Sequence, residues 1–161
     1  MLPASTAPVP PPAAVQTTTD TIQIDLVGMA SLPTIQRLNH TVFGEARVIN
    51  QLDRRDLLMF LASVGGEPVG FKVGYGLTRT TFYSAKGGVL EPWRGRGVAR
   101  ALLHAMEAEV RRLGYPRFAY DTFPNMHPGM TVLGLREGFE VTAAGYNATY
   151  QDYRIRFEKA L

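Results

Sequence analysis

The stretch RGRGVAR, residues 94–100, carries the clearest chemical signal in the sequence. It lies between an apolar run and a long amphipathic pattern, so a helix should begin within it. The first N–H groups of a helix have no partner within the helix, and a glycine-rich turn lets several N–H groups point at one anion. We therefore predict a phosphate or pyrophosphate cradle made of backbone, with Arg94, Arg96 and Arg100 adding charge around its rim.

Two widespread phosphate-binding loops do not fit this stretch. The pattern GxxxxGK[ST] is absent from the sequence. The dinucleotide pattern GxGxxG fails because Arg100 stands where the third glycine belongs, and because the preceding strand belongs to a meander and not to a first βαβ unit. The pattern R-x-x-G-x-A does match, at Arg94, Gly97 and Ala99.

The composition argues against several other kinds of site. The 161 residues contain no cysteine, which excludes a disulfide framework, a cysteine-based zinc site and a cysteine nucleophile. The three histidines, His40, His104 and His127, are not spaced as metal ligands, so we expect no metal. A net charge of +3 without a long Lys/Arg block suits a small anionic ligand, and we expect no nucleic-acid partner.

The chain is predicted to consist of a tail and one domain. Residues 1–19 are rich in proline, alanine and threonine and carry no charge, which predicts a flexible tail. The remaining residues, 20–161, are predicted to form a single domain. No apolar stretch reaches the roughly 20 residues that a membrane-spanning helix needs, so we expect no membrane partner. The opening residues lack the features of a secretory signal, which favours a cytoplasmic location.

Hydrophobic periodicity predicts a mixed α/β sheet. Ser31 should begin a first helix as its N-cap, with a second helix from Val98 and a third over 128–137, whereas the polar segment 43–57 could hold one further short helix. Strands are predicted over 21–28, 57–64, 69–77, 81–90, 117–122, 140–146 and 153–157. The resulting order, β-α-(α)-β-β-β-α-β-α-β-β, places the RGRGVAR stretch after a meander of strands.

Val89, followed after four residues by Arg94, Gly97 and Ala99, resembles the acyl-CoA signature of the GCN5-related N-acetyltransferases, the GNAT family. The predicted order of elements is also similar to that family from Thr21 to about Phe157. The resemblance implies a GNAT-like mixed, mostly antiparallel sheet flanked by helices. It also implies acetyl-CoA as cosubstrate and an amine as acetyl acceptor.

The resemblance implies the residues of the cofactor site. The backbone of Gly95 to Arg100 would cradle the pyrophosphate. Val89 would occupy the bulged strand position, whose backbone binds pantetheine and whose N–H stabilises the oxyanion of the thioester. His127 falls about where many members have a cofactor-contacting asparagine, and Asn125 lies nearby. The complete expected set is Val89, Arg94, Gly95, Arg96, Gly97, Val98, Ala99, Arg100, Asn125 and His127.

Two positions depart from the family pattern. Glu91 takes the usual proline position, and Pro92 comes one residue later. Gly134 stands five residues before Phe139, where many members carry the tyrosine that protonates the departing thiolate. The usual proton donor is therefore missing, and Tyr120, Tyr146 and Tyr150 are candidates to replace it.

The candidate catalytic residues are Glu45, Asp121 and Tyr120. Glu45 lies in a region that walls the acceptor pocket in the family, so it could bind or deprotonate the amine, or be a solvated loop carboxylate. Asp121 ends a strand facing the cleft and could act as a base, or serve a cap or turn. Other side chains are expected to play lesser roles: Tyr75 and Tyr83 as packing or pocket-lining aromatics, His104 as a solvated residue and His40 on a helix surface.

Two functions stay open at this point. The first is an N-acetyltransferase, in which a small-molecule or peptide amine attacks acetyl-CoA directly. A covalent route through a cysteine is closed because the chain has none. The second is a non-catalytic module that binds or senses acyl-CoA, which Gly134 keeps open. A homodimer is possible in either case.

Overall fold

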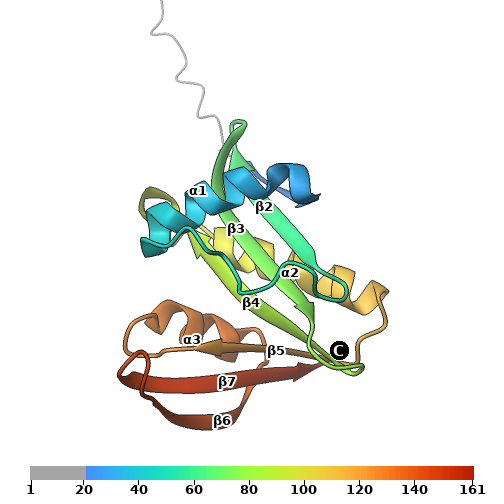
Figure 1. Ribbon diagram of the computed structural model, residues 1–161, viewed down its shortest axis with the longest axis vertical. Helices are drawn as coiled ribbons and strands as arrows, with labels where there is room; N and C mark the ends of the chain where they lie inside the picture. The colour runs from blue at the N-terminus through green and yellow to red at the C-terminus, as the bar shows by residue number, and fades with distance from the viewer. Residues whose placement is uncertain (1–20) are drawn as a thin grey trace, which may run out of the picture.

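The computed structural model describes residues 21–161, and the tail expected at 1–19 lies outside the described residues. In the described part of the chain, seven strands form one sheet in the order β1-β2-β3-β4-β5-β7-β6. All neighbouring pairs are antiparallel except β4 and β5. The mixed, mostly antiparallel sheet flanked by helices is therefore confirmed (Figure 1).

The observed elements follow the predicted order closely. The strands are β1 (Ile22–Val27), β2 (Leu58–Val64), β3 (Glu67–Gly76), β4 (Thr81–Val89), β5 (Arg117–Thr122), β6 (Glu140–Asn147) and β7 (Asp152–Ala160). The α-helices are α1 (Leu32–Phe43), α2 (Val98–Arg112) and α3 (Pro128–Arg136), and short 3-10 turns cover Met29–Ser31 and Glu91–Trp93. None of these helices is long and apolar enough to cross a bilayer.

Two details of the first half differ from expectation. Ser31 does precede α1, but its side chain makes no capping hydrogen bond, because the 3-10 turn before it already holds it in a helical conformation. The short helix predicted within 43–57 does not form. The segment instead runs as a loop over β3 and β4 (Figure 1), tethered by buried Val48 and by the Asn39 side chain, which bonds loop carbonyls that a helix would have used.

Helices cover both faces of the sheet and bury two apolar layers. On one face, Ile35 and Leu38 of α1 pack with Phe71 and Val73 of β3. On the other face, α2 packs on strands β1 to β4. Gly70 allows close approach there, since a Cβ at this position would lie 3.2 Å from Val98. The sheet is thus packed between helices on both faces, next to the glycine-rich turn at residues 94–100 that precedes α2.

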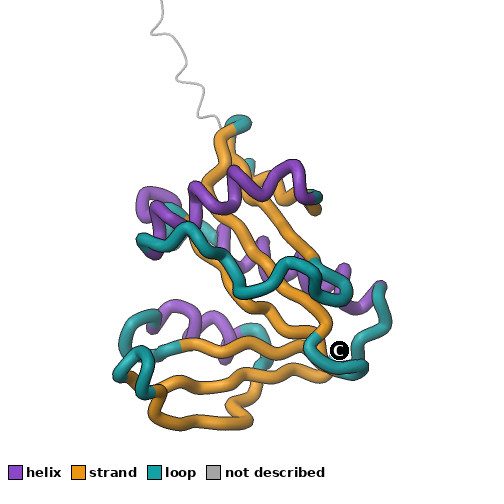
Figure 2. The backbone as a smooth tube through the Cα atoms, in the orientation of Figure 1, coloured by secondary structure: helices purple, strands orange, loops and turns teal. Residues whose placement is uncertain are grey.

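Strands β4 and β5 separate partway along their length (Figure 2). Their parallel pairing covers only Thr81–Ser84 of β4, although β4 continues to Val89. At the same point, pairing of β4 with β3 skips one residue, Ala85, which forms a β-bulge. The bulge expected at Val89 is therefore wrong in position, because Val89 pairs in regular register with Gly70. The opened edge of β4 runs from Ala85 to the glycine-rich turn.

Candidate active site

The RGRGVAR stretch forms a tight turn that leads into α2. Gly95 and Gly97 have left-handed backbones, with φ of 73° and 86°, which turn the chain sharply into α2. The first helical hydrogen bond runs from the N–H of Ala101 to the carbonyl of Gly97 at 3.0 Å. The six backbone N–H groups of Gly95 to Arg100 have no hydrogen-bond partner among the described residues. Such a row of unpaired donors at a helix start is suited to a phosphate group.

The arginine side chains of this turn bind neighbouring protein groups. Arg94 donates from Nε to the carbonyl of Val89 at 3.1 Å, which ties the turn to the end of β4. The guanidinium of Arg96 lies 4.8 Å from the ring centre of Trp93. Arg100 donates to Glu137 at 2.6 Å. The rim arginines thus hold the turn in shape, and the unpaired groups are those of the backbone.

The free edge of β4 presents further backbone donors. The N–H of Leu90 bonds the carbonyl of Val69 on β3 at 2.9 Å. Successive residues of a strand point their N–H and C=O groups to opposite sides, so those of Val89 and Gly87 point away from β3, toward the gap beside β5. Val89 and Gly87 therefore both present backbone groups to this gap, and Gly87 is an additional candidate. Gly87 could have been predicted from the sequence, because residues two apart on a strand point their backbone groups to the same side and Gly87 lies two residues before Val89.

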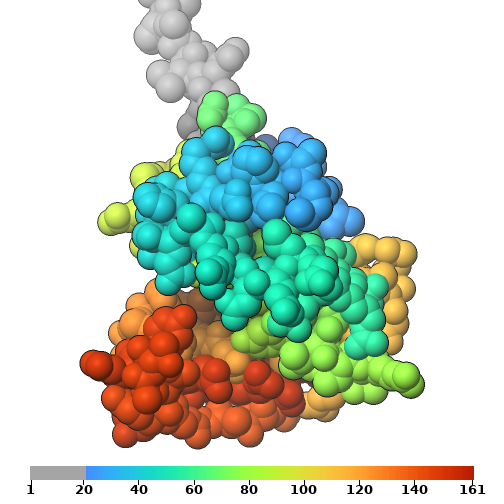
Figure 3. Space-filling view, viewed as in Figure 1, coloured from blue at the N-terminus to red at the C-terminus, as the bar shows by residue number. Residues whose placement is uncertain are grey.

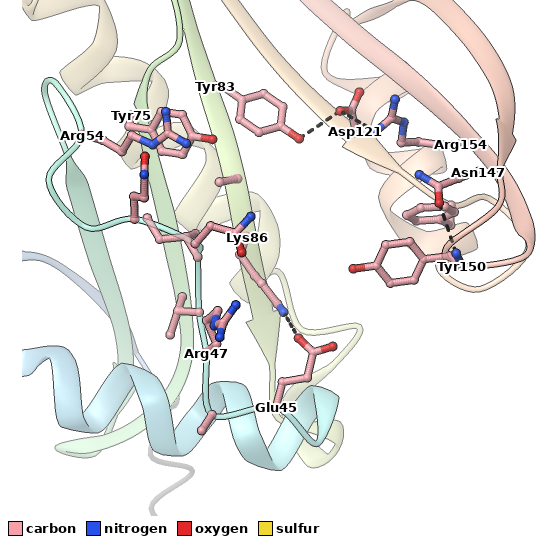
Figure 4. A pocket seen from close by; sticks show the side chains of 17 residues that line it. Glu45, Arg47, Arg54, Tyr75, Tyr83, Lys86, Asp121, Asn147, Tyr150 and Arg154 are labelled. Atoms are coloured by element: carbon pink, nitrogen blue, oxygen red, sulfur yellow. Dashed lines mark hydrogen bonds and ion pairs between the residues drawn. The ribbon is translucent and has the colours of Figure 1, made fainter.

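A pocket opens where β4 and β5 diverge. Its volume is about 740 Å³, and it lies between the 44–57 loop and the β6–β7 end of the sheet, where the space-filling view is hollowed (Figure 3). Two predicted catalytic residues line it, Glu45 and Asp121, together with Tyr75 and Tyr83 from the meander. These tyrosines were expected to be packing or pocket-lining aromatics, and they do both, since their ring centres lie 5.8 Å apart. Figure 4 shows how the lining side chains face one another across the opening.

Asp121 lies in a network that links the two halves of the sheet. Its carboxylate accepts hydrogen bonds from Arg156 at 2.8 and 2.9 Å and from the Tyr83 hydroxyl at 2.9 Å. Partial burial works to raise the pKa of Asp121, but these hydrogen bonds and the charge of Arg156 outweigh it and hold the pKa below its usual range. A carboxylate so held accepts a proton poorly at neutral pH, which disfavours Asp121 as the general base.

Glu45 is more accessible. The loop that carries it is fixed by Asn39, whose amide donates to the carbonyls of Glu45 at 2.6 Å and Arg47 at 3.2 Å. Its carboxylate accepts a hydrogen bond from Lys86 at 2.7 Å, and Lys86 also lies 4.6 Å from the ring centre of Phe43. The Glu45 side chain is half exposed within the pocket. It is therefore the acidic candidate that an incoming amine could reach.

Tyr120 does not line the pocket. It is buried on the face covered by α2 and α3, and its hydroxyl donates to the carbonyl of Met130 at 2.8 Å. Burial raises the pKa of Tyr120. A hydroxyl whose proton is already bonded and whose ionisation is opposed by burial is a poor acid, so its position favours a structural role.

The other two candidate acids differ in position. Tyr150 lines the pocket, and its hydroxyl has no hydrogen-bond partner among the described residues. Its ring packs on Phe123, with ring centres 4.9 Å apart. Tyr146 packs on Tyr153 outside the pocket lining. Only Tyr150 of the three candidate tyrosines thus presents a hydroxyl to the pocket.

The remaining polar candidates have partners of their own. Asn125 donates to Asp152 at 2.8 Å, and the ring of His127 packs edge-on against Phe43. His40 lies on the exposed side of α1, as expected. His104 is exposed, as expected, but it also has a partner, because its Nε2 lies 2.5 Å from a carboxylate oxygen of Glu137. Among residues 21–161, no group of three metal-ligating side chains comes together.

The model of the acetyltransferase (GNAT) family matches residues 25–130, well over half of the chain. The chain belongs to the GNAT family of acetyltransferases. Acetyl-CoA is the cosubstrate of GNAT enzymes, and the six unpaired N–H groups of the cradle fit its pyrophosphate.

Solved GNAT structures share the fold at low sequence identity. The ribosomal-protein-S18-alanine N-acetyltransferase of Escherichia coli is 16% identical, with a TM-score of 0.72 and coverage of 87% of this chain and 94% of that one. The IAA acetyltransferase of Bacillus cereus is 17% identical, with a TM-score of 0.74 and coverage of 88% of this chain and 100% of that one. Arabidopsis thaliana NAA60 in complex with acetyl-CoA is 14% identical, with a TM-score of 0.69 and coverage of 88% of this chain and 99% of that one. The comparison with curated proteins gives no significant match.

Proposed function

We propose that this GNAT protein is an N-acetyltransferase that transfers the acetyl group of acetyl-CoA to a primary amine by direct attack. The observation that carries the proposal is the continuity of three features. The unpaired N–H groups of Gly95 to Arg100 lead into the free edge of β4, and that edge leads into the pocket lined by Glu45. An acetyl-CoA molecule bound along the turn and the free edge of β4 would present its acetyl group to an acceptor in the pocket.

The backbone supplies the donor side of the site. In this proposal the N–H groups of Gly95 to Arg100 bind the pyrophosphate, and the N–H groups of Val89 and Gly87 bind the pantetheine arm and the thioester carbonyl. An N–H group fixed in a strand is already oriented before the reaction, so it stabilises negative charge that develops on the carbonyl oxygen. One such donor typically contributes a few kcal/mol, about 3 in measured cases.

The pocket supplies the acceptor side. Glu45 is proposed to bind the ammonium form of the acceptor and to take its proton, since its carboxylate is half exposed in the pocket. Tyr150 is proposed to donate a proton to the departing thiolate in place of the tyrosine that Gly134 replaces. Direct attack is the simplest route, because the sequence has no cysteine to carry the acetyl group.

A non-catalytic acyl-CoA sensor is the second candidate. Gly134 favours it, because this position lacks the family's proton donor and the nearby Tyr120 hydroxyl is bonded to Met130. Thiol release from acetyl-CoA across a panel of amines separates the two functions. Amine-dependent release supports the transferase, whereas tight acetyl-CoA binding without release on any amine supports the sensor.

Three further expectations stay predictions. The first is a homodimer. Exposed apolar side chains on β6 and β7, Val141 and Tyr153 among them, are available for such a contact. Sedimentation at several concentrations would measure the oligomeric state. A cytoplasmic location and the absence of a nucleic-acid partner also remain predictions of the sequence.

A further inference from the structure

The charges in the pocket beside Glu45 are unbalanced. Four basic side chains line it, Arg47, Arg54, Lys86 and Arg154, against two acidic ones, Glu45 and Asp121. Each acidic side chain already has a close basic partner, Lys86 for Glu45 and Arg156 for Asp121. Arg154 reaches Asp121 only at 3.9 Å. The pocket therefore carries positive charge that the described residues do not neutralise.

Arg47 and Arg54 are the least compensated of these cations. Neither guanidinium has a carboxylate within ion-pair distance among residues 21–161. Both belong to the 44–57 loop and lie on the same wall of the pocket (Figure 4). A guanidinium presents a planar fork of donors that matches carboxylate and phosphate oxygens, so each of them is suited to an anion.

The structure holds the backbone of Arg47 and the guanidinium of Arg54 in place. Asn39, fully buried on α1, donates to the carbonyl of Arg47, and the neighbouring Val48 is buried in the core. The guanidinium of Arg54 lies 4.7 Å from the ring centre of Tyr75, which also lines the pocket. The loop ends where the carbonyl of Arg55 accepts a hydrogen bond from Gly76 at 2.8 Å. The loop that carries both cations is thus anchored at one wall before a ligand arrives, which lowers the ordering cost of binding.

We infer that the acceptor amine also carries an anionic group, a carboxylate or a phosphate, which Arg47 and Arg54 bind while the amine lies toward Glu45. This inference rests on the proposed function, because it takes this pocket as the acceptor site. A volume of about 740 Å³ suits a small molecule. A polycationic acceptor would instead meet the positive potential of the pocket, which would keep its local concentration low.

The first test measures anion binding without catalysis. The protein is saturated with CoA, so that the cradle at Gly95–Arg100 cannot take up the added anion, and is titrated with inorganic phosphate and, separately, with succinate. We expect saturable binding that weakens at least tenfold in the Arg47→Gln/Arg54→Gln double variant. Arg79→Gln is the matched control, since Arg79 is an exposed arginine of the β3–β4 turn outside this pocket. Absence of binding, or equal binding by the double variant, overturns the inference.

The second test compares acceptors that differ in one group. An amino acid is compared with its amide and its decarboxylated amine, and phosphoethanolamine with ethanolamine, using kcat/KM with acetyl-CoA. We expect the anionic member of at least one set to be preferred at least tenfold, and the set concerned distinguishes carboxylate from phosphate. That preference should disappear in the double variant. A preference for the neutral amines or for a diamine overturns the inference. Anion binding lost in the double variant, with no amine acetylated, upholds the anion site and refutes the proposed function.

Discussion

The hydroxyl of Tyr120 occupies the space that a side chain at position 134 would need. A Cβ added to Gly134 would overlap this hydroxyl, which donates to the carbonyl of Met130. Gly134 of α3 and Tyr120 of β5 are therefore in close contact, and this contact leaves no room for a side chain at position 134. We call these two positions a packing unit, and we expect the effect on stability of a substitution at one to depend on the residue at the other.

Gly134→Ala is expected to destabilise the fold by about 1–3 kcal/mol, because the added methyl group must displace the Tyr120 hydroxyl. Chemical denaturation measures the loss. Gly129→Ala is the matched control on the same helix, since no atom lies within 4 Å of a Cβ there.

The Tyr120→Phe/Gly134→Ala double variant completes this test. Removing the hydroxyl frees room for the new methyl group, so the cost of Gly134→Ala should fall by at least half in the Tyr120→Phe background. Additive effects of the two substitutions would contradict the packing unit. A Gly134→Ala protein as stable as the Gly129→Ala control would contradict it as well.

Lys72 should make stability depend on pH in the alkaline range. It is buried on β3 with no hydrogen-bond partner among the described residues, and burial lowers its pKa from 10.5 to about 8. Below about pH 8 the amine is charged in both the folded and the unfolded chain, so the folded state bears the full cost of burying a charge. Between about pH 8 and 10.5 only the unfolded chain keeps the proton, and this cost fades.

Lys72→Met is therefore expected to raise the free energy of unfolding by up to about 3 kcal/mol at pH 7. The gain should shrink as the pH rises from about 8 toward 10.5. Urea denaturation of both proteins at pH 7, 9 and 10.5 measures the difference. A gain in the free energy of unfolding that is constant over this range, or a loss at pH 7, would show that burial of the charged Lys72 amine does not destabilise the fold.

Asp121→Asn should act on stability and leave the pH profile of turnover in place. The substitution breaks the ion pair with Arg156, at a cost of about 1–3 kcal/mol at pH 7. The folded-state pKa of Asp121 is depressed, so its contribution is present above the ordinary pKa of 3.8 and is lost as the pH falls further. The stability difference between the two proteins should accordingly shrink as the pH falls below 3.8.

The kinetic part of this experiment addresses the general base. Because the Asp121 pKa lies below its usual range, its titration cannot produce an acidic limb in kcat/KM near neutral pH. Asp121→Asn should keep any such limb at the same pH. A limb that disappears in this variant, in a protein that remains folded, would instead make Asp121 the base.

Tyr150→Phe tests the proposed replacement for the missing acid. Its hydroxyl faces the pocket without a partner, so its removal should cost little stability. We expect kcat to fall at least tenfold with little change in the KM for acetyl-CoA. Tyr146→Phe is the matched control, because Tyr146 is equally exposed but lies outside the pocket. Equal kcat values for the two variants would exclude Tyr150 as the proton donor.

Local patterns were sufficient to predict most of the fold. The strand over Arg117–Thr122 and the helix beginning at Val98 follow from periodicity and glycine placement, which depend on neighbouring residues only. The 43–57 segment was harder, because its course depends on burial of Val48 and on hydrogen bonds from Asn39. The bulge at Ala85 inserts a single residue, which leaves no mark on the hydrophobic pattern.

The site was predictable in its backbone part and not in its side-chain part. The cradle lies within one short segment, so glycine spacing is enough to indicate it. The partners of Asp121 come from positions 83 and 156, and the partner of His104 is Glu137, far away in the sequence. Such pairs are set by how the strands and helices pack, and nothing in local spacing indicates them.

The most direct test of the cradle is acetyl-CoA binding by Gly97→Glu, measured by calorimetric titration. Gly114→Glu is its matched control, because both glycines have φ of 86° and open space around a Cβ, at opposite ends of α2. The backbone strain is thus the same, but only Gly97→Glu brings a negative charge to the unpaired N–H groups. We predict that Gly97→Glu loses at least 100-fold in affinity while Gly114→Glu binds as the wild type does. A folded Gly97→Glu protein with unchanged affinity would contradict the cradle.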